Sequence, residues 1–186
     1  MAITADSEAI RQKWDTRYRH SHINAERVAD ALSQNQHLLP PAGTALDLAC
    51  GLGGNALFLA EKGFEVHAWD ISPVAIERLG AVAQQRGLAL HSQVRDCLAQ
   101  PPEANRFDII VVSRFLERTL CPAISAALRP GGILIYQTYT QERRAPTGPA
   151  NTHFLLQEGE LMMLFSRLER LLYLEGEEAQ FIGRKR

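Results

Sequence analysis

The sequence predicts an α/β fold, with a doubly wound, mostly parallel sheet that carries helices on both faces. Over residues 44–140, short apolar segments alternate with helical patterns across short loops, which is typical of this fold class. In DIIVV, at 108–112, apolar residues fall on both faces, as expected of a strand buried on both sides of a parallel sheet. Two further helical patterns precede this region, so N-terminal helices are expected before the sheet.

Two helices are expected at the start of the chain. Ile10, Trp14 and Tyr18 recur every four residues within 7–18, which is the spacing of one helix face, and a serine precedes them as a cap. The segment 25–39 has a second helical pattern. Tandem prolines end it, because proline lacks an amide hydrogen and clashes with the preceding turn.

Five strands and three helices are expected in the core. The strands are the apolar segments 44–50, 64–70, 88–94, 106–113 and 132–140. Helical patterns lie between them at 55–62, 72–86 and 122–129. Ser72 and Pro73 mark the start of the second helix as an N-cap and a first-turn proline, and Gly87 lies beyond its end. Pro130 is expected to stop the third helix, within a Pro-Gly-Gly turn before the fifth strand.

The chain changes character after residue 140. Residues 141–154 are polar and rich in Pro, Gly, Thr and Asn, which is typical of lids and binding loops. A helix over 160–168 and a terminal hairpin with a turn at 175–178 are expected to follow. We therefore expect one domain over 1–186, with N-terminal helices or a lid in 1–41, a cofactor-binding core in 42–140, and a substrate loop, helix and hairpin in 141–186.

Composition excludes several classes of protein. The chain has 186 residues, the size of one domain, and its formal net charge of -1 provides no positive field for nucleic acid or anionic lipid. Three cysteines without a CxxC pair argue against a disulfide framework and a zinc site, and no metal is expected. Reduced thiols, a charged N-terminus without an apolar leader, and the lack of a run of ~18 apolar residues favour a cytoplasmic protein with no membrane partner.

The strongest chemical signal is LDLACGLGGNAL at 46–57, where a strand leads into a glycine-rich turn and a helix. Glycines let the backbone approach a ligand, and the free N–H groups of the helix start carry a partial positive charge. The pattern of Gly51 and Gly53 is weak alone, because such turns also join strand to helix without a ligand. Asp70, nineteen residues after Gly51, strengthens it, since a carboxylate ending the second strand can accept both ribose hydroxyl protons. The alternative is that Asp70 only caps the next helix.

This geometry suits a nicotinamide dinucleotide or S-adenosylmethionine, and three features favour the second. Asp47, inside the end of the first strand, would suit a methionine ammonium group. Asp96 closes the third strand, where an adenine amino group needs an acceptor. The chain ends in a helix and hairpin rather than in the substrate domain of a dehydrogenase. A nicotinamide-dependent Rossmann oxidoreductase and a non-catalytic module that binds an adenosyl ligand remain alternatives.

The motifs ALDLACGLGGNA, HAWDIS, RDCL, FDIIVVS and LRPGG, within 45–140, resemble those of class I S-adenosylmethionine-dependent methyltransferases. The resemblance is closer to the small bacterial methyltransferases related to the tellurite-resistance protein. The segment KWDTRY at 13–18 of this chain resembles the first helix of those proteins. It implies a Rossmann-like, seven-stranded sheet with its last strand antiparallel. It also implies in-line transfer of a methyl group from S-adenosylmethionine, which leaves S-adenosylhomocysteine.

The resemblance implies roles for individual cofactor-binding residues. Trp14, Arg17 and Tyr18 would close over the methionine end, although an aromatic stripe that packs on the sheet edge explains them nearly as well. The other implied contacts are Ala49, Gly51 and Gly53 under the methionine moiety, Asp70 on the ribose, Ile71 on the adenine face, Asp96 and Cys97 at the adenine edge, and Ser113 beside the sulfonium.

The acceptor is expected to be a small molecule or a small oxyanion. VVSRFLER, after the fourth strand, departs from the Asn/Asp-Pro-Pro-aromatic motif of amino-group methyltransferases, so a nucleic-acid base is disfavoured. Arg114 and Tyr139 are the candidate catalytic residues at the strand ends, and His153 is a candidate general base. Arg114, Arg143 and Arg144 could bind an anionic acceptor, although Arg143 and Arg144 could equally form a solvated charge pair. We expect a monomer or a homodimer.

Overall fold

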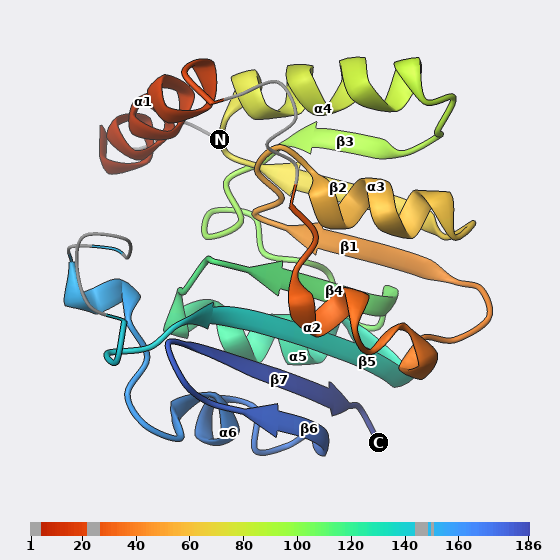
Figure 1. Cartoon of the computed structure of the whole chain (residues 1–186), viewed down its shortest axis with the longest axis vertical. Coiled ribbons are helices and arrows are strands. Elements are labelled where there is room, and N and C mark those ends of the chain that lie inside the picture. Colours follow the sequence, from red (N-terminus) through yellow and green to blue (C-terminus); the bar gives the residue numbers. More distant parts are fainter. Residues whose placement is uncertain (1–4, 22–26, 144–148, 150) are drawn as a thin grey trace.

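The computed structural model describes residues 5–21, 27–143, 149 and 151–186. A seven-stranded sheet with the order β3-β2-β1-β4-β5-β7-β6 runs through the molecule (Figure 1). Its strands are β1 Thr44–Leu48, β2 Glu65–Asp70, β3 His91–Val94, β4 Phe107–Ser113, β5 Leu128–Tyr139, β6 Glu169–Leu174 and β7 Glu178–Arg184. Strands β1 to β5 pair in parallel, and β7 lies antiparallel between β5 and β6. The predicted fold class, with an antiparallel last strand, is confirmed.

Helices cover both faces of the sheet. They are α1 Ala5–Arg19, α2 Asp30–Ser33, α3 Gly54–Glu61, α4 Pro73–Gln85, α5 Cys121–Ala127 and α6 Glu160–Leu164. One hydrophobic cluster joins the sheet to α2, α3 and α4, and a second joins it to α5 and α6. On β4, Ile109 and Val111 belong to the first cluster, whereas Ile110 and Val112 belong to the second. An apolar run without a polar face therefore indicated a strand that is packed on both sides.

The second predicted helix is wrong over most of its length. Residues 25 and 26 lie outside the described residues, 27–29 are not helical, and only α2 and a short 3₁₀ turn at Gln36–Leu38 follow. The N–H groups of Ala29 and Ala31 donate to the side chains of Asn55 and Gln137, both at 2.8 Å, instead of to helix carbonyls. Contacts with α3 and β5 thus override the local helical pattern.

Three other boundaries differ from the prediction. The fifth helix ends at Ala127 and β5 begins at Leu128, so Pro130 lies inside the strand rather than in a turn before it. Backbone hydrogen bonds from this segment to Lys185, at 2.7 and 2.9 Å, extend the sheet there. The third strand begins at His91, because the N–H of Leu88 still bonds back to α4. The helix predicted over 160–168 ends at Leu164.

The parallel strands bring the residues that follow β1 to β5 to one edge of the sheet, here called the carboxyl edge. Helix α1 lies at this edge in Figure 1, beside the start of α4. The cap predicted for α4 is confirmed, since Ser72 Oγ accepts from the N–H of Ala75 at 3.2 Å. Within the described ranges, no helix is both long and apolar enough to cross a membrane.

Replacing Gly53 with alanine is expected to destabilise the protein by about 2–4 kcal/mol. The added methyl group would lie 2.3 Å from Leu79 Cδ1, and the φ of +81° disfavours any side chain. Gly80→Ala within α4 is the control, because nothing lies within 4 Å of its added methyl group. It is expected to stabilise the protein by about 1 kcal/mol through helix propensity. Urea denaturation measures both changes, and a Gly53→Ala variant as stable as the wild type would contradict the close packing of the turn on α4.

Candidate functional site at the carboxyl edge

The glycine-rich turn after β1 has an unusual backbone. Ala49, Gly51 and Gly53 have φ values of 55°, 54° and 81°, so every second residue is left-handed. Alternation of this kind curls the backbone into a tight, concave turn of the type that cradles ligand groups. The N–H of Gly53 closes the turn by donating to the Cys50 carbonyl at 2.9 Å. A left-handed alanine is uncommon and indicates that the surrounding structure holds this conformation.

Asp70 ties this turn to the start of α4. One carboxylate oxygen accepts from the N–H of Gly51 at 2.8 Å, and the other accepts from the N–H of Ser72 at 2.9 Å. The side chain is buried, and burial raises its pKa while these two hydrogen bonds oppose the rise. The side chain that caps α4 is that of Ser72. The alternative, in which Asp70 only caps this helix, therefore does not hold.

Asp47 points to α3. Its Oδ2 accepts from the N–H of Ala56 at 3.0 Å and its Oδ1 accepts from Asn55 Nδ2 at 3.3 Å. Asn55 Nδ2 also donates to Ser113 Oγ at 3.2 Å, so Asn55 links the ends of β1 and β4. Burial raises the pKa of Asp47 to about 7. Both Asp47 and Ser113 therefore lie at the edge as predicted, joined by an asparagine that the sequence analysis missed.

The residues after β2 and β3 form the adenine side of the predicted site. Asp96 Oδ1 accepts from the N–H groups of Leu98 and Ala99, at 2.9 and 3.3 Å. Its other oxygen accepts from Ser7 Oγ of α1 at 2.6 Å. Cys97 is buried, which raises the pKa of its thiol to about 12, and Ile71 is half-buried. The thiol is accordingly a packing group rather than a nucleophile.

Helix α1 crosses this part of the edge. Trp14 and Tyr18 stack with their ring centroids 5.6 Å apart, and both side chains are half-buried. Tyr18 lies on the glycine turn, because its hydroxyl oxygen is 2.8 Å from the position that a Cβ on Gly51 would occupy. Burial raises the pKa of Tyr18, and the nearby Asp70 adds to the rise. Arg17 is exposed, with its guanidinium carbon 5.4 Å from the centre of the Trp14 ring.

A second cluster lies at the ends of β4, β5 and β7. Arg114 directly follows β4 with a φ of 52°, and its Nε is 3.3 Å from Glu178 Oε1. Arg143 Nη1 lies 3.7 Å from the same oxygen, and its guanidinium carbon is 4.7 Å from the centre of the Tyr139 ring. Gln137 donates to the other oxygen of Glu178. Both described arginines that were candidates for anion binding therefore face a carboxylate.

His153 lies apart from these contacts. Its ring is exposed on a 3₁₀ turn, Thr152–Phe154, and makes an edge contact with the ring of Phe154. Arg118 holds this turn by donating to the His153 carbonyl at 2.7 Å, and it lines a cavity of about 350 Å³ with His153 and Gln157. Arg144 lies outside the described residues. Tyr136 is buried, with its hydroxyl donating to the Phe115 carbonyl at 2.9 Å.

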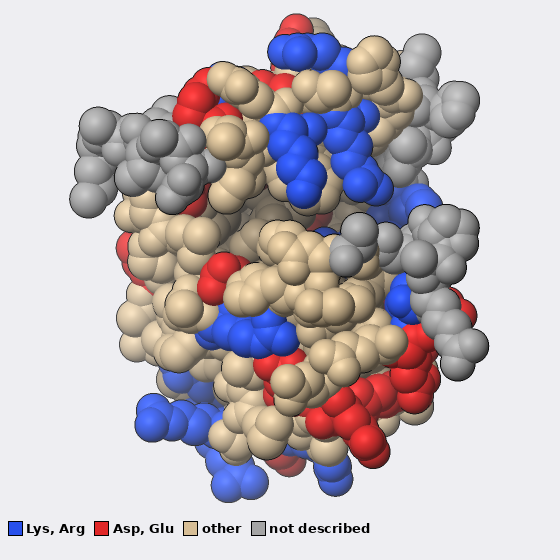
Figure 2. Space-filling model, turned by 90° about the vertical axis from the view of Figure 1, so that its left-hand side faces the viewer, with Lys and Arg blue, Asp and Glu red and all other residues tan. Residues whose placement is uncertain are grey.

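Figure 2 shows the carboxyl edge face-on. The face is hollowed near its centre, and Lys and Arg side chains lie on the rim above the hollow. Among the described residues, no group of three or more His, Cys, Asp or Glu side chains is placed to hold a metal ion.

Comparisons with known proteins bear on this arrangement. Residues 45–132 match the family described as a methyltransferase domain. The chain is 30% identical over 167 residues to Hemagglutinin 1 of Eikenella corrodens, covering 85% of this chain and 54% of that protein. It is 30% identical over 112 residues to the probable chloroplastic tocopherol O-methyltransferase of Oryza sativa subsp. japonica, covering 56% of this chain and 31% of that protein. The chain therefore spans about half or less of the length of these curated relatives.

The structure of TehB from Haemophilus influenzae has a similar fold. It aligns with a TM-score of 0.76 and 20% identity over 93% of this chain and 67% of that chain. Residues 45–132 therefore match a methyltransferase domain, in agreement with the motifs read from the sequence. The likeness to TehB confirms the predicted Rossmann-like fold. The family match favours the methyltransferase interpretation over a nicotinamide-dependent oxidoreductase.

Several residues of the carboxyl edge were not identified from the sequence. Glu178 is placed there only because β7 pairs with β5 so that Glu178 faces Tyr139. Asn55 and Gln137 lie within a helix and a strand that look apolar, and their amide groups satisfy backbone N–H groups near α2. A polar residue in an apolar segment was the only available signal, since it must find a partner once it is buried.

We expect Asp47 to make stability depend on pH. The unfolded carboxyl loses its proton near pH 3.8, whereas the folded protein keeps it to about pH 7. The stabilising contribution is present below the lower value and is lost as the pH rises through the higher one. Between about pH 5 and pH 8 the loss is about 2–3 kcal/mol. Urea denaturation across this range measures it, and Asp47→Asn, which cannot ionise, is expected to give a flatter profile. Parallel profiles would contradict the buried, protonated state.

Removing the carboxylate of Glu178 is expected to lower the free energy of unfolding by about 1–2 kcal/mol, because two arginines lose a partner at a partly buried position. Glu177→Ala is the matched control, since Glu177 is exposed and lies 3.5 Å from Arg143. Its effect is expected to stay below about 0.5 kcal/mol. Thermal and urea unfolding of both alanine variants compare the two sites, and equal effects would argue against Glu178 as the shared partner.

Proposed function

We propose that this chain binds S-adenosylmethionine at the ends of β1, β2 and β3, and transfers its methyl group to a small-molecule acceptor at the ends of β4 and β5. The observation that carries the proposal is the joint placement of the left-handed glycine turn, Asp70 and Asp96 along one sheet edge. A curled backbone beside two carboxylates is suited to an adenosyl group, which offers hydroxyl and amino hydrogens.

The carboxylates fit this ligand in their observed state. Each oxygen of Asp70 accepts one backbone hydrogen bond, and a carboxylate has about four acceptor positions in total. Ribose hydroxyls can therefore add to Asp70 without displacing Gly51 or Ser72. Because the turn and α4 fix the carboxylate, the acceptor is already oriented before the ligand arrives, and the cost of ordering it is lowered.

Asp47, Trp14, Arg17 and Tyr18 belong to the methionine end in this proposal. Asp47 is deeply buried, and a protonated amino group nearby would favour its ionised form. Tyr18 already lies on the glycine turn, so α1 supplies a cover over the methionine position. Ala49, Gly51 and Gly53 form the floor, and Ser113 lies at the adjoining end of β4.

The acceptor half is formed by Arg114 and Tyr139. When bound, S-adenosylmethionine supplies a methyl group on a positively charged sulfur that is already activated for transfer. The chain then has to hold the acceptor atom in line, ~3–3.5 Å from the methyl group, and to exclude water. The left-handed Arg114 is anchored by its N–H, which donates to the Gln137 carbonyl at 2.8 Å. This anchoring supports a positioning role for Arg114.

The charges at this half support an uncharged acceptor over a small oxyanion, because Glu178 faces both Arg114 and Arg143. One relative is named as a tocopherol O-methyltransferase, which supports a hydroxyl group as the acceptor. His153 has the weakest support as a general base, since its ring is exposed on the 3₁₀ turn. A cytoplasmic location and a monomeric or homodimeric state stay predictions.

The test is a parallel calorimetric titration of the purified, cofactor-free protein with S-adenosylmethionine, S-adenosylhomocysteine and NADH. Binding of both adenosyl ligands without NADH is expected. Binding of NADH alone would support the oxidoreductase alternative and overturn the proposal. Binding of the adenosyl ligands without methyl transfer to any member of a panel of phenols, quinols and thiols would support the non-catalytic module.

Asp70→Asn locates the ligand at the proposed edge. It is expected to weaken binding of S-adenosylhomocysteine by about 10- to 100-fold, because a charged acceptor is lost while the shape of the side chain is kept. Asp108→Asn is the control, since Asp108 pairs with Arg129 and the N–H of Thr44 at the opposite end of the strands. Equal affinities of Asp70→Asn and the wild type would refute the ribose assignment.

A further inference from the structure

Helix α1 contacts the carboxyl edge once above each of the first three strands. Ser7 contacts Asp96 after β3, Asp15 contacts Ser72 after β2, and Tyr18 lies on Gly51 after β1. Figure 1 shows the helix crossing this edge beside the start of α4. The three contacts are spread along the helix, so each end of α1 has a separate attachment.

Resting on the proposed function, we propose that two of these contacts act in opposite directions on cofactor binding. Asp15 is a positioning residue that fixes α1 to Ser72 and keeps Tyr18 over the glycine turn. The hydrogen bond of Ser7 to Asp96 is a latch that occupies the adenine acceptor and opens when the cofactor binds.

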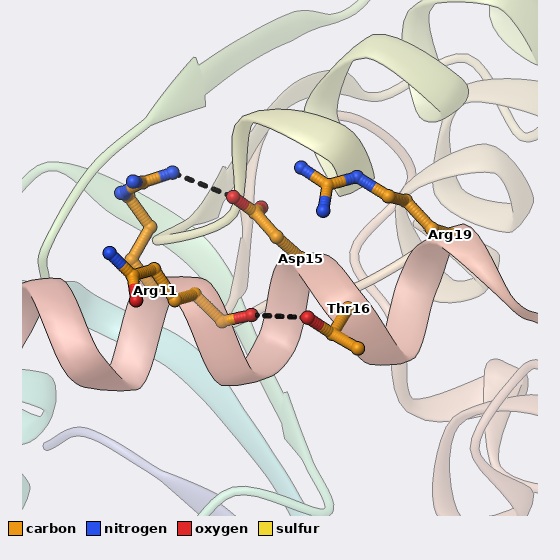
Figure 3. Close-up of a pocket in the computed structure, with 5 residues that line it drawn as sticks. Arg11, Asp15, Thr16 and Arg19 are labelled. Carbon is orange, nitrogen blue, oxygen red and sulfur yellow. Dashed lines mark hydrogen bonds and ion pairs between the residues drawn. The ribbon is translucent and has the colours of Figure 1, made fainter.

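The Asp15 contact is specific and buried. Asp15 is only 2% exposed, whereas its neighbours Thr16 and Arg17 are exposed. Its Oδ1 accepts from Ser72 Oγ at 2.5 Å and its Oδ2 accepts from Arg11 Nη1 at 2.6 Å. In Figure 3 the guanidinium of Arg11 points to the Asp15 carboxylate. A buried carboxylate is tolerated when both of its oxygens are paired, and here one of the partners belongs to another element of the fold.

Ser72 connects this contact to the proposed ribose site. Its N–H donates to Asp70 Oδ1 at 2.9 Å, and its hydroxyl oxygen caps α4 at the N–H of Ala75. Asp15 and Asp70 therefore both accept from Ser72, but Asp15 accepts from its hydroxyl and Asp70 from its backbone N–H. Because the attachment of α1 uses none of the oxygens of Asp70, it stays intact when a ribose binds there.

The last turn of α1 is fixed from the same side. Arg78 of α4 donates to the carbonyl of Tyr18, and also to the carbonyl of Ser21 at 3.2 Å. Together with Asp15, this places the aromatic ring of Tyr18 on Gly51. The C-terminal half of α1 is therefore built as a cover that is compatible with a bound cofactor.

The Ser7 contact differs because it uses the acceptor that the cofactor needs. Ser7 Oγ donates to Asp96 Oδ2 at 2.6 Å, while Oδ1 already accepts from the N–H groups of Leu98 and Ala99. Ser7 fills one acceptor position of Oδ2, so an adenine amino group that approaches Asp96 from the side of α1 would compete with the serine for that position. The first turn of α1 has to release Asp96 as the adenine enters, while Asp15 holds the rest of the helix.

The proposal predicts effects of opposite sign on binding of S-adenosylhomocysteine. Ser7→Ala is expected to tighten binding by about 2- to 10-fold, because a competing hydrogen bond is removed. Asp15→Asn is expected to weaken binding by about 10-fold or more, through faster dissociation, because the charged acceptor of two hydrogen bonds is lost. Stopped-flow tryptophan fluorescence and calorimetry measure the rates and the affinities.

Matched controls separate these roles from general effects on α1. Glu8→Gln removes a half-buried carboxylate that pairs with the same Arg11 on the same helix. Ser33→Ala removes an exposed hydroxyl whose hydrogen bond stays within α2. Both controls are expected to bind S-adenosylhomocysteine as the wild type does. Circular dichroism and thermal unfolding confirm that each variant is folded before binding is compared.

A double-mutant cycle tests the partner of Asp15. If Asp15 acts through Ser72, the double variant Asp15→Asn with Ser72→Ala is expected to dissociate S-adenosylhomocysteine only slightly faster than the single variants do. The fold increase in its dissociation rate stays well below the product of the two single fold increases. If the two single fold increases in dissociation rate multiply in the double variant, the positioning role through Ser72 is overturned. A loss of thermal stability with an unchanged dissociation rate would also overturn it, because Asp15 would then be purely structural.

The outcomes distinguish this inference from the proposed function. A wild-type protein that binds no S-adenosylhomocysteine overturns both. A wild-type protein that binds it, with Ser7→Ala no tighter than Ser33→Ala, overturns the latch alone. Likewise, Asp15→Asn with the affinity of Glu8→Gln overturns the positioning role while leaving the cofactor assignment in place.

Discussion

The carboxylate of Asp70 joins the glycine turn after β1 to the first residues of α4, and the rest of the edge is arranged around it. It binds the N–H groups of Gly51 and Ser72, which belong to segments that are far apart in the sequence. Ser72 in turn caps α4 and receives Asp15 from α1. One buried side chain thus fixes the glycine turn and the start of α4 directly, and α1 indirectly through Ser72. These three segments surround the proposed cofactor site. Because the acceptor groups of the protein are already held in place, a ligand can bind to them without the cost of rearranging them.

Buried acids at the edge are costly to the isolated protein and useful for binding. Burial raises the pKa of both Asp47 and Asp70, so the folded chain holds these carboxyl groups in an environment that opposes their charge. A ligand that brings hydroxyl and ammonium hydrogens relieves this opposition. The left-handed Ala49 and Arg114 add backbone strain after β1 and β4, which are neighbouring strands at this edge. Strain and unfavourable burial are therefore concentrated where a methyl donor and an acceptor would meet.

The edge divides into two halves with different charge. In the half under α1, Asp70 has backbone N–H groups as partners and can take further donors from a ligand, whereas one oxygen of Asp96 is held by Ser7. In the other half, Glu178 faces Arg114 and Arg143, so charges are matched within the protein. This difference follows from topology, because β7 enters the sheet in the reverse direction and brings the start of its strand to the ends of the parallel strands.

The sequence by itself determined the sheet, the glycine turn, the cap of α4 and the terminal hairpin, because short-range patterns of burial, glycine and proline encode them. It also indicated that Asp47, Asp70 and Asp96 lie at the carboxyl ends of strands of one parallel sheet, which meet at one edge. Only the tertiary structure decided what each carboxylate contacts, since their partners lie up to 89 positions away, as for Ser7 and Asp96. Within the predicted helix over 25–39 it left only the short helix α2 and a 3₁₀ turn, because Asn55 and Gln137 satisfy backbone groups that a longer helix would have paired. Hydrogen bonds between distant segments leave no periodic signal in a sequence, so the cover of the site and the partners of its arginines emerged only from the fold.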